Sequence, residues 1–505
     1  MSAVWQAVLL ISLAAPPAAP PVLRVRVTDF DTGAPLEDAR VLVFAAKESG
    51  PAAEGRTGEQ GAAEFGRLPP GALRVVASAA GYAGAAWILP SGTPAEVGFP
   101  MLRLGVVAGR VTSASGTPLP GALVTLMAES AEGEPLQLPP EAAARLVAVA
   151  GASGSYRLHG IPPGRYVAGA LRILESQSDG GAPVLTAAAA PARRLSIVPG
   201  APEITADFVF PETPAGRLRG RVDWPADRGA MLVSLTPAEF PAMPVLRVVA
   251  DGHGNFEFPS VPAGEYFLSA AGPSLGPGGR SGVLGADAAV AVRRVTVSPG
   301  STSEVDLEPK QAQTGWLRIE TKEARGARPC ASRVELHLYP AIGVGAKLHH
   351  KVTAAAGTRA PVQVFDGLPY AAALDSPDAA CAAGSPPQLL KRDDPASPEH
   401  SIRLAPCASL AGSLRSTSGR PGGFAALLWP ETGASSKFSW IAFLPDEAGN
   451  FEASCLPPGT YRALAVPLPH RAQRGWNRQA GAGLEVELFA GGKARIELTA
   501  LLPEQ

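Results

Sequence analysis

Apolar residues in this chain occur in short runs, and the clearest of these runs alternate with polar residues. Residues 23–27 read Leu-Arg-Val-Arg-Val, so the apolar side chains all point to one side, as in a half-buried β-strand. Comparable runs lie at 107–111 and 410–414, and turn-forming glycine and proline separate the runs along the chain. The pattern predicts an all-β protein built from short strands.

A ten-residue spacing between two glycines recurs four times. In each copy an aliphatic residue and a proline follow seven and eight residues after the first glycine. Proline presets φ and glycine accepts a positive φ, so we predict a β-hairpin closed by a type II turn. The first glycines are Gly61, Gly154, Gly254 and Gly449, and the turn glycines, taken as structural residues, are Gly71, Gly164, Gly264 and Gly459.

A second signature precedes the glycine pair in several copies. Gly33 and Gly116 each begin the pattern Gly-x-Pro-Leu-x-x-Ala-x-Val, and Gly419 begins a shorter form of it. The copies are roughly 100 residues apart, which indicates tandem β-domains rather than one large enzyme fold. About seven short strands in each copy is the size of a β-sandwich. The predicted domains are 21–103, 104–214, 215–309, 310–405 and 406–505.

Together the two signatures resemble the carboxypeptidase regulatory-like domain. The second domain carries them most clearly, followed by the first and the fifth, whereas the third keeps only the glycine pair and the fourth is marginal. The resemblance implies a transthyretin-like fold, and therefore a tandem array of about five seven-stranded Greek-key β-sandwiches. In exported bacterial proteins such modules resemble spacers, adhesion modules or carbohydrate-binding-like domains. No catalytic function carries over, and the repeats leave no room for a peptidase domain.

The fourth domain departs from the pattern, because Pro361 and Ala371 occupy the two glycine positions. Alanine is strained at a positive φ, so we expect another turn geometry there. Each domain also contains an irregular segment, which is interpreted either as a recognition loop or as a variable connection. These segments are 79–94, 175–192, 272–288, 376–398 and 467–483. Short linkers between the domains predict a semi-rigid string.

Charge and hydropathy limit the partners and the location. The net charge of −1 and the pI of about 6.7 give no electrostatic reason to bind nucleic acid. Residues 1–20 carry an apolar run too short to span a bilayer, which indicates a secretory signal peptide, with an uncleaved anchor as the alternative. We find no later apolar stretch long enough for a membrane span. The predicted location is exported: periplasmic, outer-surface or secreted.

The four cysteines all lie in the last third of the chain. An even number in an exported chain favours two disulfides, and three connectivities are possible. We prefer pairing within a repeat, which would close two loops of about 50 residues. The candidate disulfide residues are Cys330, Cys381, Cys407 and Cys455.

The sequence gives no catalytic, cofactor-binding or metal-binding residues to propose. Asp29 and Asp251 begin segments similar to calcium loops, but both segments lack the late bidentate glutamate, and turn formation explains them. Trp429 and Trp440 lie in apolar runs and are expected in a core. Trp476 lies in the irregular segment 467–483 and is the one candidate for ligand contact.

The preferred function is therefore a non-enzymatic exported scaffold or adhesion protein that displays loops to an unknown protein or polysaccharide at the cell surface. The alternative is a carbohydrate-binding protein that uses loop aromatics such as Trp476. A hydrolase with an unrecognised site would need convergent titratable residues, for which the sequence offers no candidates.

Overall fold

The computed structural model describes residues 22–45, 51–91, 96–129, 135–136, 146–176, 184–197, 203–212, 214–241, 246–272, 288–321, 333–342, 350–355, 357–375, 385–390, 399–404, 407–416, 424–431, 440–467 and 483–500. Apart from one short 3-10 helix, η1 (Ala226–Arg228), the regular structure in these residues is β-strand. The predicted all-β class is confirmed.

The first repeat unit shows the plan that the others follow. A three-stranded sheet, in the order β4-β1-β7, faces the strands β3-β2-β5-β6, and the apolar sides of both sheets form one buried cluster. The strands are β1 (Leu23–Asp29), β2 (Arg40–Ala45), β3 (Ala53–Arg56), β4 (Ala62–Phe65), β5 (Leu73–Ser78), β6 (Ala85–Leu89) and β7 (Glu96–Met101). β1 and β7 are parallel, while β1 and β4 are antiparallel.

The second unit repeats this order with three of its strands each interrupted into two pieces. One sheet contains β12-β8-β16, with β17 also paired to β8, and the other contains β10 and β11 on β9, followed by β13 with β14 and β15. The strands are β8 (Gly105–Ser113), β9 (Leu123–Glu129), β10 (Pro135–Leu136), β11 (Val147–Val149), β12 (Ser155–Ile161), β13 (Gly164–Ser176), β14 (Val184–Ala189), β15 (Arg193–Ile197), β16 (Ile204–Thr205) and β17 (Phe208–Phe210).

The third unit has the orders β21-β18-β24 and β20-β19-β22-β23. Its strands are β18 (Ala215–Arg221), β19 (Leu232–Pro237), β20 (Leu246–Val249), β21 (Asn255–Pro262), β22 (Gly264–Ala271), β23 (Ala289–Val297) and β24 (Thr302–Glu304).

The fourth and fifth units keep the same plan. The fourth has the orders β29-β26-β32 and β28-β27-β30-β31, and the fifth has β36-β33-β39 and β35-β34-β37-β38. The fourth unit contains β25 (Lys310–Gln311), β26 (Gln313–Thr321), β27 (Arg333–Pro340), β28 (His350–Ala355), β29 (Arg359–Val364), β30 (Tyr370–Asp375), β31 (Ser385–Leu389) and β32 (Glu399–Leu404). The fifth contains β33 (Ala408–Ser416), β34 (Phe424–Pro430), β35 (Trp440–Phe443), β36 (Asn450–Leu456), β37 (Gly459–Pro467), β38 (Leu484–Leu488) and β39 (Lys493–Ala500).

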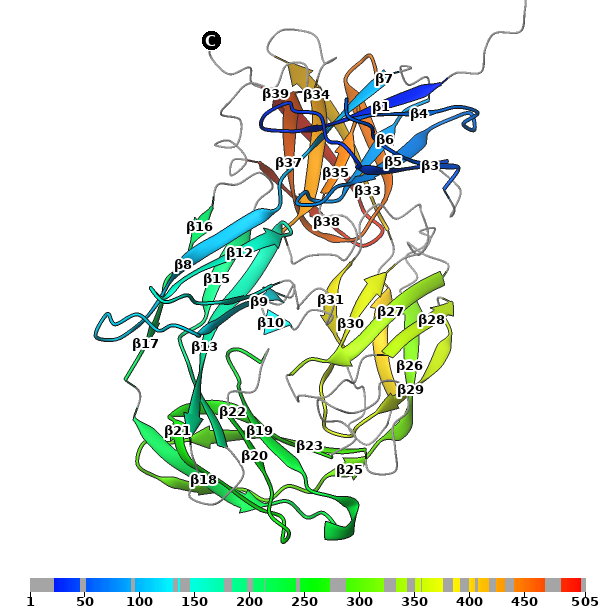
Figure 1. Ribbon diagram of the computed structural model, residues 1–505. Helices are drawn as coiled ribbons and strands as arrows, with labels where there is room; N and C mark the ends of the chain where they lie inside the picture. The colour runs from blue at the N-terminus through cyan, green and yellow to red at the C-terminus, as the bar shows by residue number, and fades with distance from the viewer. Residues whose placement is uncertain are drawn as a thin grey trace, which may run out of the picture.

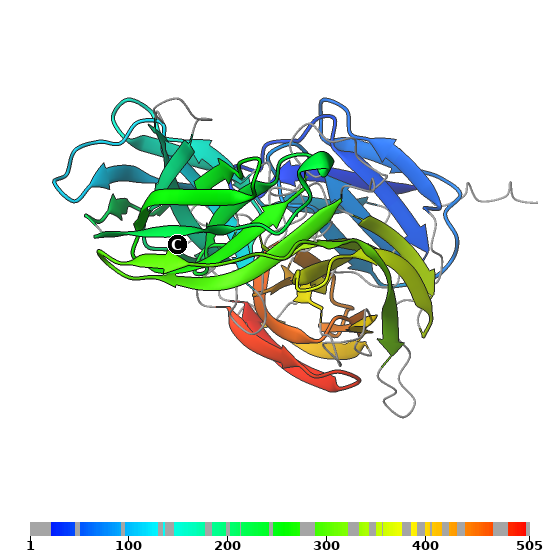
Figure 2. The ribbon, with the colours of Figure 1, turned by 90° about the horizontal axis from the view of Figure 1, so that it is seen from below.

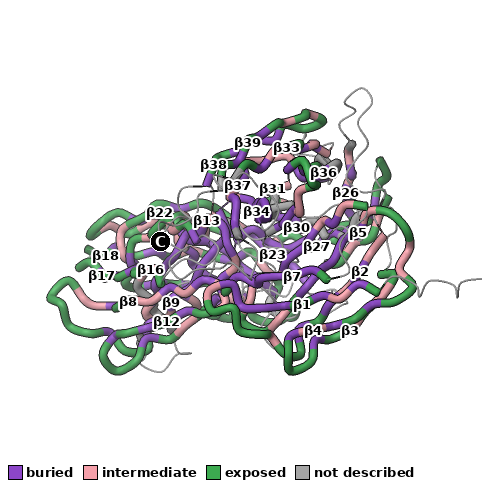
Figure 3. Tube along the Cα trace, turned by 90° about the horizontal axis from the view of Figure 1, so that it is seen from above, coloured by how far each residue is buried: buried purple, intermediate pink, exposed green. Residues whose placement is uncertain are grey.

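The five units form a closed array. In Figure 1 the chain descends from the blue first unit through the second to the green third unit, and returns through the fourth to the orange fifth unit beside the first. Figure 2, seen from below, shows the green strands of the third unit continuing the sheet of the second. Buried positions run through the interior strands, whereas the peripheral turns are exposed (Figure 3). The predicted string is corrected in one respect, because its two ends are joined where β6 pairs with β35.

The first glycine of each ten-residue pair sits at a corner that carries the chain from one sheet to the other. Gly154 has φ 72°, and its carbonyl accepts a 2.8 Å hydrogen bond from Val111 N on β8. A Cβ at this position would lie 2.4 Å from the carbonyl oxygen of Val111. Gly61 and Gly254 make the same approach, with a Cβ 2.4 and 2.2 Å from the equivalent carbonyl oxygens. Only glycine meets both requirements.

The ten-residue segment is an arch rather than the predicted hairpin. β12 pairs with β8, whereas β13 pairs with β9, β14 and β15 in the opposite sheet. The second glycine begins or precedes the returning strand, and the φ values of Gly71, Gly164, Gly264 and Gly459 are 109°, 148°, 159° and 149°. A type II turn needs φ near 80°, so that turn assignment is also corrected, although the positive φ still favours glycine. The segment is not a hairpin because the chain crosses from one sheet to the other within it. The two flanking strands therefore pair with strands of different sheets and not with each other.

A buried tyrosine ties the arch together in three units. Tyr166, Tyr266 and Tyr461 each donate their hydroxyl to the carbonyl of the motif proline four residues earlier, at 2.8, 2.8 and 2.7 Å. This contact gives the recurring tyrosine a physical reason: it satisfies a carbonyl at the point where the chain leaves one sheet.

The fourth unit reaches the same fold with different turn residues. Ile319 N donates to Thr358 O, as Val111 N does to Gly154 O, so Thr358 rather than Pro361 occupies the first glycine position. Ala371 is buried in β30 and has no positive φ, and Gly367 supplies the φ of 75° in this turn. The expected change of turn geometry is confirmed. The alignment of Pro361 is corrected, because this arch is longer than the others.

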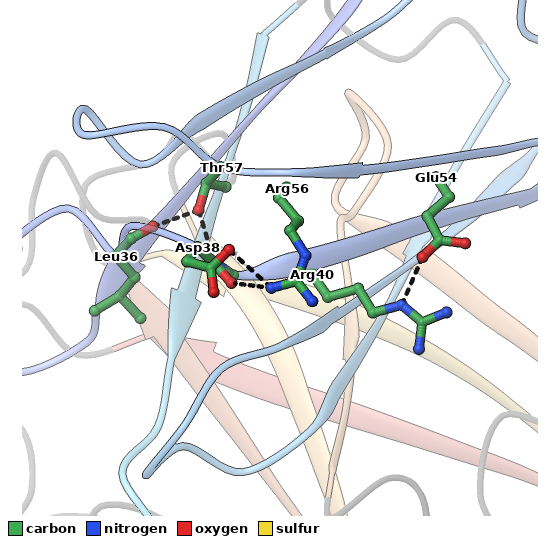
Figure 4. A network of polar contacts seen from close by, with 7 residues as sticks. Leu36, Asp38, Arg40, Glu54, Arg56 and Thr57 are labelled. Atoms are coloured by element: carbon green, nitrogen blue, oxygen red, sulfur yellow. Dashed lines mark hydrogen bonds and ion pairs between the residues drawn. The ribbon is translucent and has the colours of Figure 1, made fainter.

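The second signature forms the turn that connects β1 to β2. In Figure 4 the Thr57 hydroxyl donates to Leu36 O at 2.5 Å and accepts from Ala39 N at 2.9 Å. Arg56 Nη1 donates to Asp38 Oδ1 at 2.8 Å across the same turn, where Asp38 has φ 57°. The motif alanine, Ala39, is completely buried beneath this network. The signature therefore specifies a packed turn.

Candidate functional site: the junctions between repeat units

The first and last units share one continuous sheet. β6 and β35 pair in parallel, with Trp440 opposite Ala85 and Phe443 opposite Ile88, to give the order β3-β2-β5-β6-β35-β34-β37-β38. Leu444 N also donates to Ile88 O at 3.3 Å. The edge strand of each terminal unit is thereby covered by the other, which removes two open edges that could pair with other chains.

β34 at this junction is buried along its whole length. Phe424, Ala426 and Leu428 belong to the cluster of the fifth unit, whereas the alternate residues Ala425, Leu427 and Trp429 belong to the cluster of the first. The expected core position of Trp429 is confirmed, although the core is that of the first unit. The side chain of Trp440 lies outside the described residues.

Three strands, two of them at the junctions, lie in segments that the sequence presented as irregular. β6 lies within 79–94, β14 within 175–192 and β31 within 376–398. The prediction of irregular structure is wrong for these strands. β6 reads Ala-Ala-Trp-Ile-Leu without alternation because both of its faces are covered. Residues 273–287 and 468–482 of the other segments lie outside the described residues.

The second and third units are joined by a sheet and by interdigitating side chains. β14 pairs with β20 through Leu185 and Arg247, and Leu171 of β13 packs in the cluster of the third unit. Phe240 of the third unit packs against Met127 and Val167 of the second, in a small separate cluster. A Cβ on Gly169 would lie 2.8 Å from the Phe240 ring, so the ring occupies the space that this glycine leaves.

The third and fourth units share one hydrophobic cluster. Ala271, Ala288 and Val290 of the third unit are buried with the core of the fourth. β25 pairs with β23, and Lys310 Nζ lies 2.6 Å from Asp366 Oδ2 beside this contact. The linker between the third and fourth units thus contributes β25 as a short strand to the sheet of the third unit.

A buried carboxylate of the first unit holds the start of the linker to the second unit. Asp29, at the end of β1, is 1% exposed, and its Oδ2 accepts from the Tyr82 hydroxyl at 2.6 Å and from Arg103 Nε at 2.7 Å. Its Oδ1 accepts from the backbone N–H groups of Asp31 and Thr32 at 2.9 and 2.8 Å. Arg103 lies in the linker to β8, so this single side chain fixes the linker to the first unit.

The interactions of Asp29 determine its charge state. Burial by itself would raise the pKa of Asp29, but the hydrogen bonds from Tyr82, Thr32 and Arg103 together outweigh burial and lower the pKa. Burial and the bond to this carboxylate raise the pKa of Tyr82 to about 12. The site is therefore a carboxylate with a neutral phenol and a guanidinium as donors, which is a structural clamp.

Replacing Asp29 by asparagine is expected to loosen this clamp in a pH-dependent way. Because the folded-state pKa is lowered, the carboxylate stabilises the fold above its unfolded-state pKa, near 3.8, and that contribution is lost as the pH falls through the folded-state value. The loss should be about 2–3 kcal/mol at pH 7 and smaller at pH 3, which lies below the unfolded-state pKa. Hydrogen exchange of β1 amides, corrected for the intrinsic rate at each pH, measures it.

Asp38→Asn is the matched control for Asp29→Asn. Its ion pair with Arg56 is exposed on both sides, with side chains 74% and 61% accessible, and asparagine accepts the positive φ of this position. We expect a change within about 0.5 kcal/mol. An equal loss for Asp29→Asn at both pH values would contradict the clamp.

The other predicted site residues have separate outcomes. Cys407, just before β33, is disulfide-bonded. Ala408 pairs with Leu456, which places the backbone of Cys455 on the neighbouring strand. This register supports the Cys407–Cys455 pairing, which stays a prediction. Cys330, Cys381 and Trp476 lie outside the described residues.

The two calcium-like segments form turns, as expected. Oδ1 of Asp251 accepts from the N–H groups of His253 and Asn255 at 2.9 and 2.7 Å, which is the same role as that of Asp29. Within the described ranges, we find no group of three or more His, Cys, Asp or Glu that could hold a metal ion. Across the same ranges, none of the helices has the length and apolarity that crossing a membrane requires.

Comparison with known protein families identifies the first unit. Residues 22–101 match the carboxypeptidase regulatory-like domain, which confirms the resemblance for this unit. The match does not include the second unit, which carried the two signatures most clearly. No curated protein matches the chain.

Solved structures of two pilins and of a third bacterial protein give low-scoring likenesses. The shaft pilin SpaA from Lactobacillus rhamnosus GG is 16% identical, and the alignment covers 38% of this chain and 96% of the pilin with a TM-score of 0.22. A streptococcal ancillary pilin is 12% identical over 57% of this chain and 98% of its own, with a TM-score of 0.18. The Bacillus anthracis TIE protein is 12% identical over 75% of this chain and 68% of its own, with a TM-score of 0.16. Function does not follow from likenesses at this level.

Proposed function

We propose that this chain is a non-enzymatic exported scaffold whose sandwiches hold loops and sheet faces at fixed positions near the cell surface. The observation that carries the proposal is the set of junctions. A shared sheet or hydrophobic cluster joins the first unit to the fifth, the second to the third and the third to the fourth, and a buried polar clamp holds the linker between the first and second units. A chain built in this way resists bending between its units, which is the property a display scaffold requires.

The regulatory-like match of residues 22–101 supports a binding or spacing role for the first unit. The apolar segment within residues 1–20, interpreted as a signal peptide, supports export. The segments between β22 and β23 and between β37 and β38 keep both interpretations, as recognition loops or as variable connections, and we adopt the first. Such loops on a rigid framework are a common place for binding residues.

Small-angle X-ray scattering of the purified chain tests the closed scaffold. Compact packing of 505 residues corresponds to a radius of gyration of about 23 Å, and we expect a value near it. A string of separate sandwiches would give a much larger radius and a distance distribution with a long tail. That outcome, or a radius that grows strongly with temperature below unfolding, would contradict a rigid closed array.

A further inference from the structure

One large aromatic side chain stands exposed on the outer face of the β29-β26-β32 sheet. Trp316 lies on the central strand β26 and is 44% exposed. Its register partners are Pro361 on β29 and Glu399 on β32, so the neighbours of the indole across the sheet are an apolar proline ring and a carboxylate. An exposed tryptophan does not contribute the favourable free energy that burial of its large apolar side chain would give.

The repeats of this chain show that the fold does not need tryptophan here. The hydrogen bond from Ile319 N to Thr358 O corresponds to those from Val27, Val111, Val222 and Leu414 to the first glycine of their units. Counting three residues back from each gives the positions equivalent to Trp316, which are Arg24, Ala108, Arg219 and Ala411. Arg24 and Arg219 form surface ion pairs with Glu64 and Glu304. An aromatic platform is particular to the fourth unit.

Polar side chains surround the indole in fixed positions. Arg318 Nε donates to Glu399 Oε1 at 2.8 Å, and Arg359 Nε lies 3.2 Å from the same oxygen. Gln363 Nε2 donates to Thr314 Oγ1 at 3.2 Å on the other side of the tryptophan. With Glu320 beside Arg318, the described side chains of this group comprise two cations and two anions, and Arg403 opposite Glu320 has a side chain outside the described residues.

We propose that this face binds a neutral polysaccharide, with one pyranose ring stacked on Trp316. The aliphatic C–H groups of a sugar ring suit the negative face of an indole, while the guanidinium, carboxylate and amide groups beside it suit hydroxyls that both donate and accept. Arg318 and Arg359 are already paired with Glu320 and Glu399, so these two guanidinium groups give little net attraction for a polyanion. A proline-rich peptide requires a groove lined by several aromatic rings, whereas the described part of this face carries one.

The site gives the scaffold a ligand and does not depend on the scaffold proposal. Scattering tests the rigidity of the array, whereas sugar binding tests this face, so either can fail alone. The site is also separate from Trp476, which lies outside the described residues.

Affinity electrophoresis of the full chain tests the platform. The probes are soluble neutral polysaccharides (xylan, galactomannan, β-glucan and amylose), with polygalacturonate and alginate as acidic probes. We expect at least one neutral probe to retard the protein and Trp316→Arg to weaken that retardation tenfold or more. Arginine occupies the equivalent position in two other units, so this variant should keep the fold, which unchanged hydrogen exchange in β26 would confirm.

Two further variants separate stacking from loss of structure. Trp316→Phe keeps a smaller ring and should retain part of the binding, and Arg24→Ala, at the equivalent position of the first unit, should bind as the wild type does. The proposal is overturned if no neutral probe retards the wild type, if only acidic probes do, or if Trp316→Arg binds normally.

Discussion

Replacing Leu427 by alanine is expected to destabilise the first repeat unit, although the residue lies on β34 of the fifth. Leu427 is 3% exposed and packs in the cluster of β1, β2, β5 and β6. Removing a buried leucine side chain costs about 2–5 kcal/mol, because apolar burial is lost and a cavity remains. Hydrogen exchange should therefore accelerate in β1 and β5, at the opposite end of the sequence.

The neighbouring residue provides the matched control. Leu428 is 1% exposed and lies on the same strand, but it faces the cluster formed by β33, β36 and β39 with its own sheet. Leu428→Ala removes the same atoms and should accelerate exchange in β33 and β36 while leaving β1 protected. If both variants affect only the fifth unit, the two ends of the array are not packed together in solution.

The sequence predicts the repeated strands much better than it predicts which strands meet. Leu-Arg-Val-Arg-Val at the first strand alternates because one face of β1 is solvated, and this local pattern is legible without a structure. Residues 424–430 read Phe-Ala-Ala-Leu-Leu-Trp-Pro and carry no such alternation, because the first unit covers their second face. A continuous apolar run indicates burial on both faces, but nothing in it names the partner.

The candidate site shows the same limit. The turn at Asp29 can be read from Asp29 and Thr32, which are close in sequence. The other two donors, Tyr82 and Arg103, are 53 and 74 residues away and are brought in by the topology. Likewise, exposure of Trp316 follows from its register in β26, whereas the sequence pattern of an isolated tryptophan is equally compatible with a core position.

Replacing the first glycine of a ten-residue pair by alanine is expected to have the second large effect on stability. This effect has two causes, which are the positive φ and the crowding of the new Cβ. Gly154→Ala should destabilise the second unit by about 3–5 kcal/mol, because alanine at φ 72° costs roughly 1–2 kcal/mol and its Cβ would also lie 2.4 Å from the Val111 carbonyl oxygen. The Val111 carbonyl, near the end of β8, accepts a 3.0 Å hydrogen bond from Leu119 N and cannot move away without losing it. Exchange rates of amides in β8 and β12 measure the loss.

Gly116→Ala in the same unit isolates the conformational part. Gly116 has φ 81°, but a Cβ there would meet nothing within 4 Å, so we expect a loss of only about 1–2 kcal/mol. The difference between the two variants is the cost of crowding the corner against β8. Equal losses would mean that the recurring first glycine is kept for its φ alone. A larger loss at Gly154 would mean that the first glycine of the ten-residue pair is also kept because the corner passes too close to the β8 backbone for any side chain.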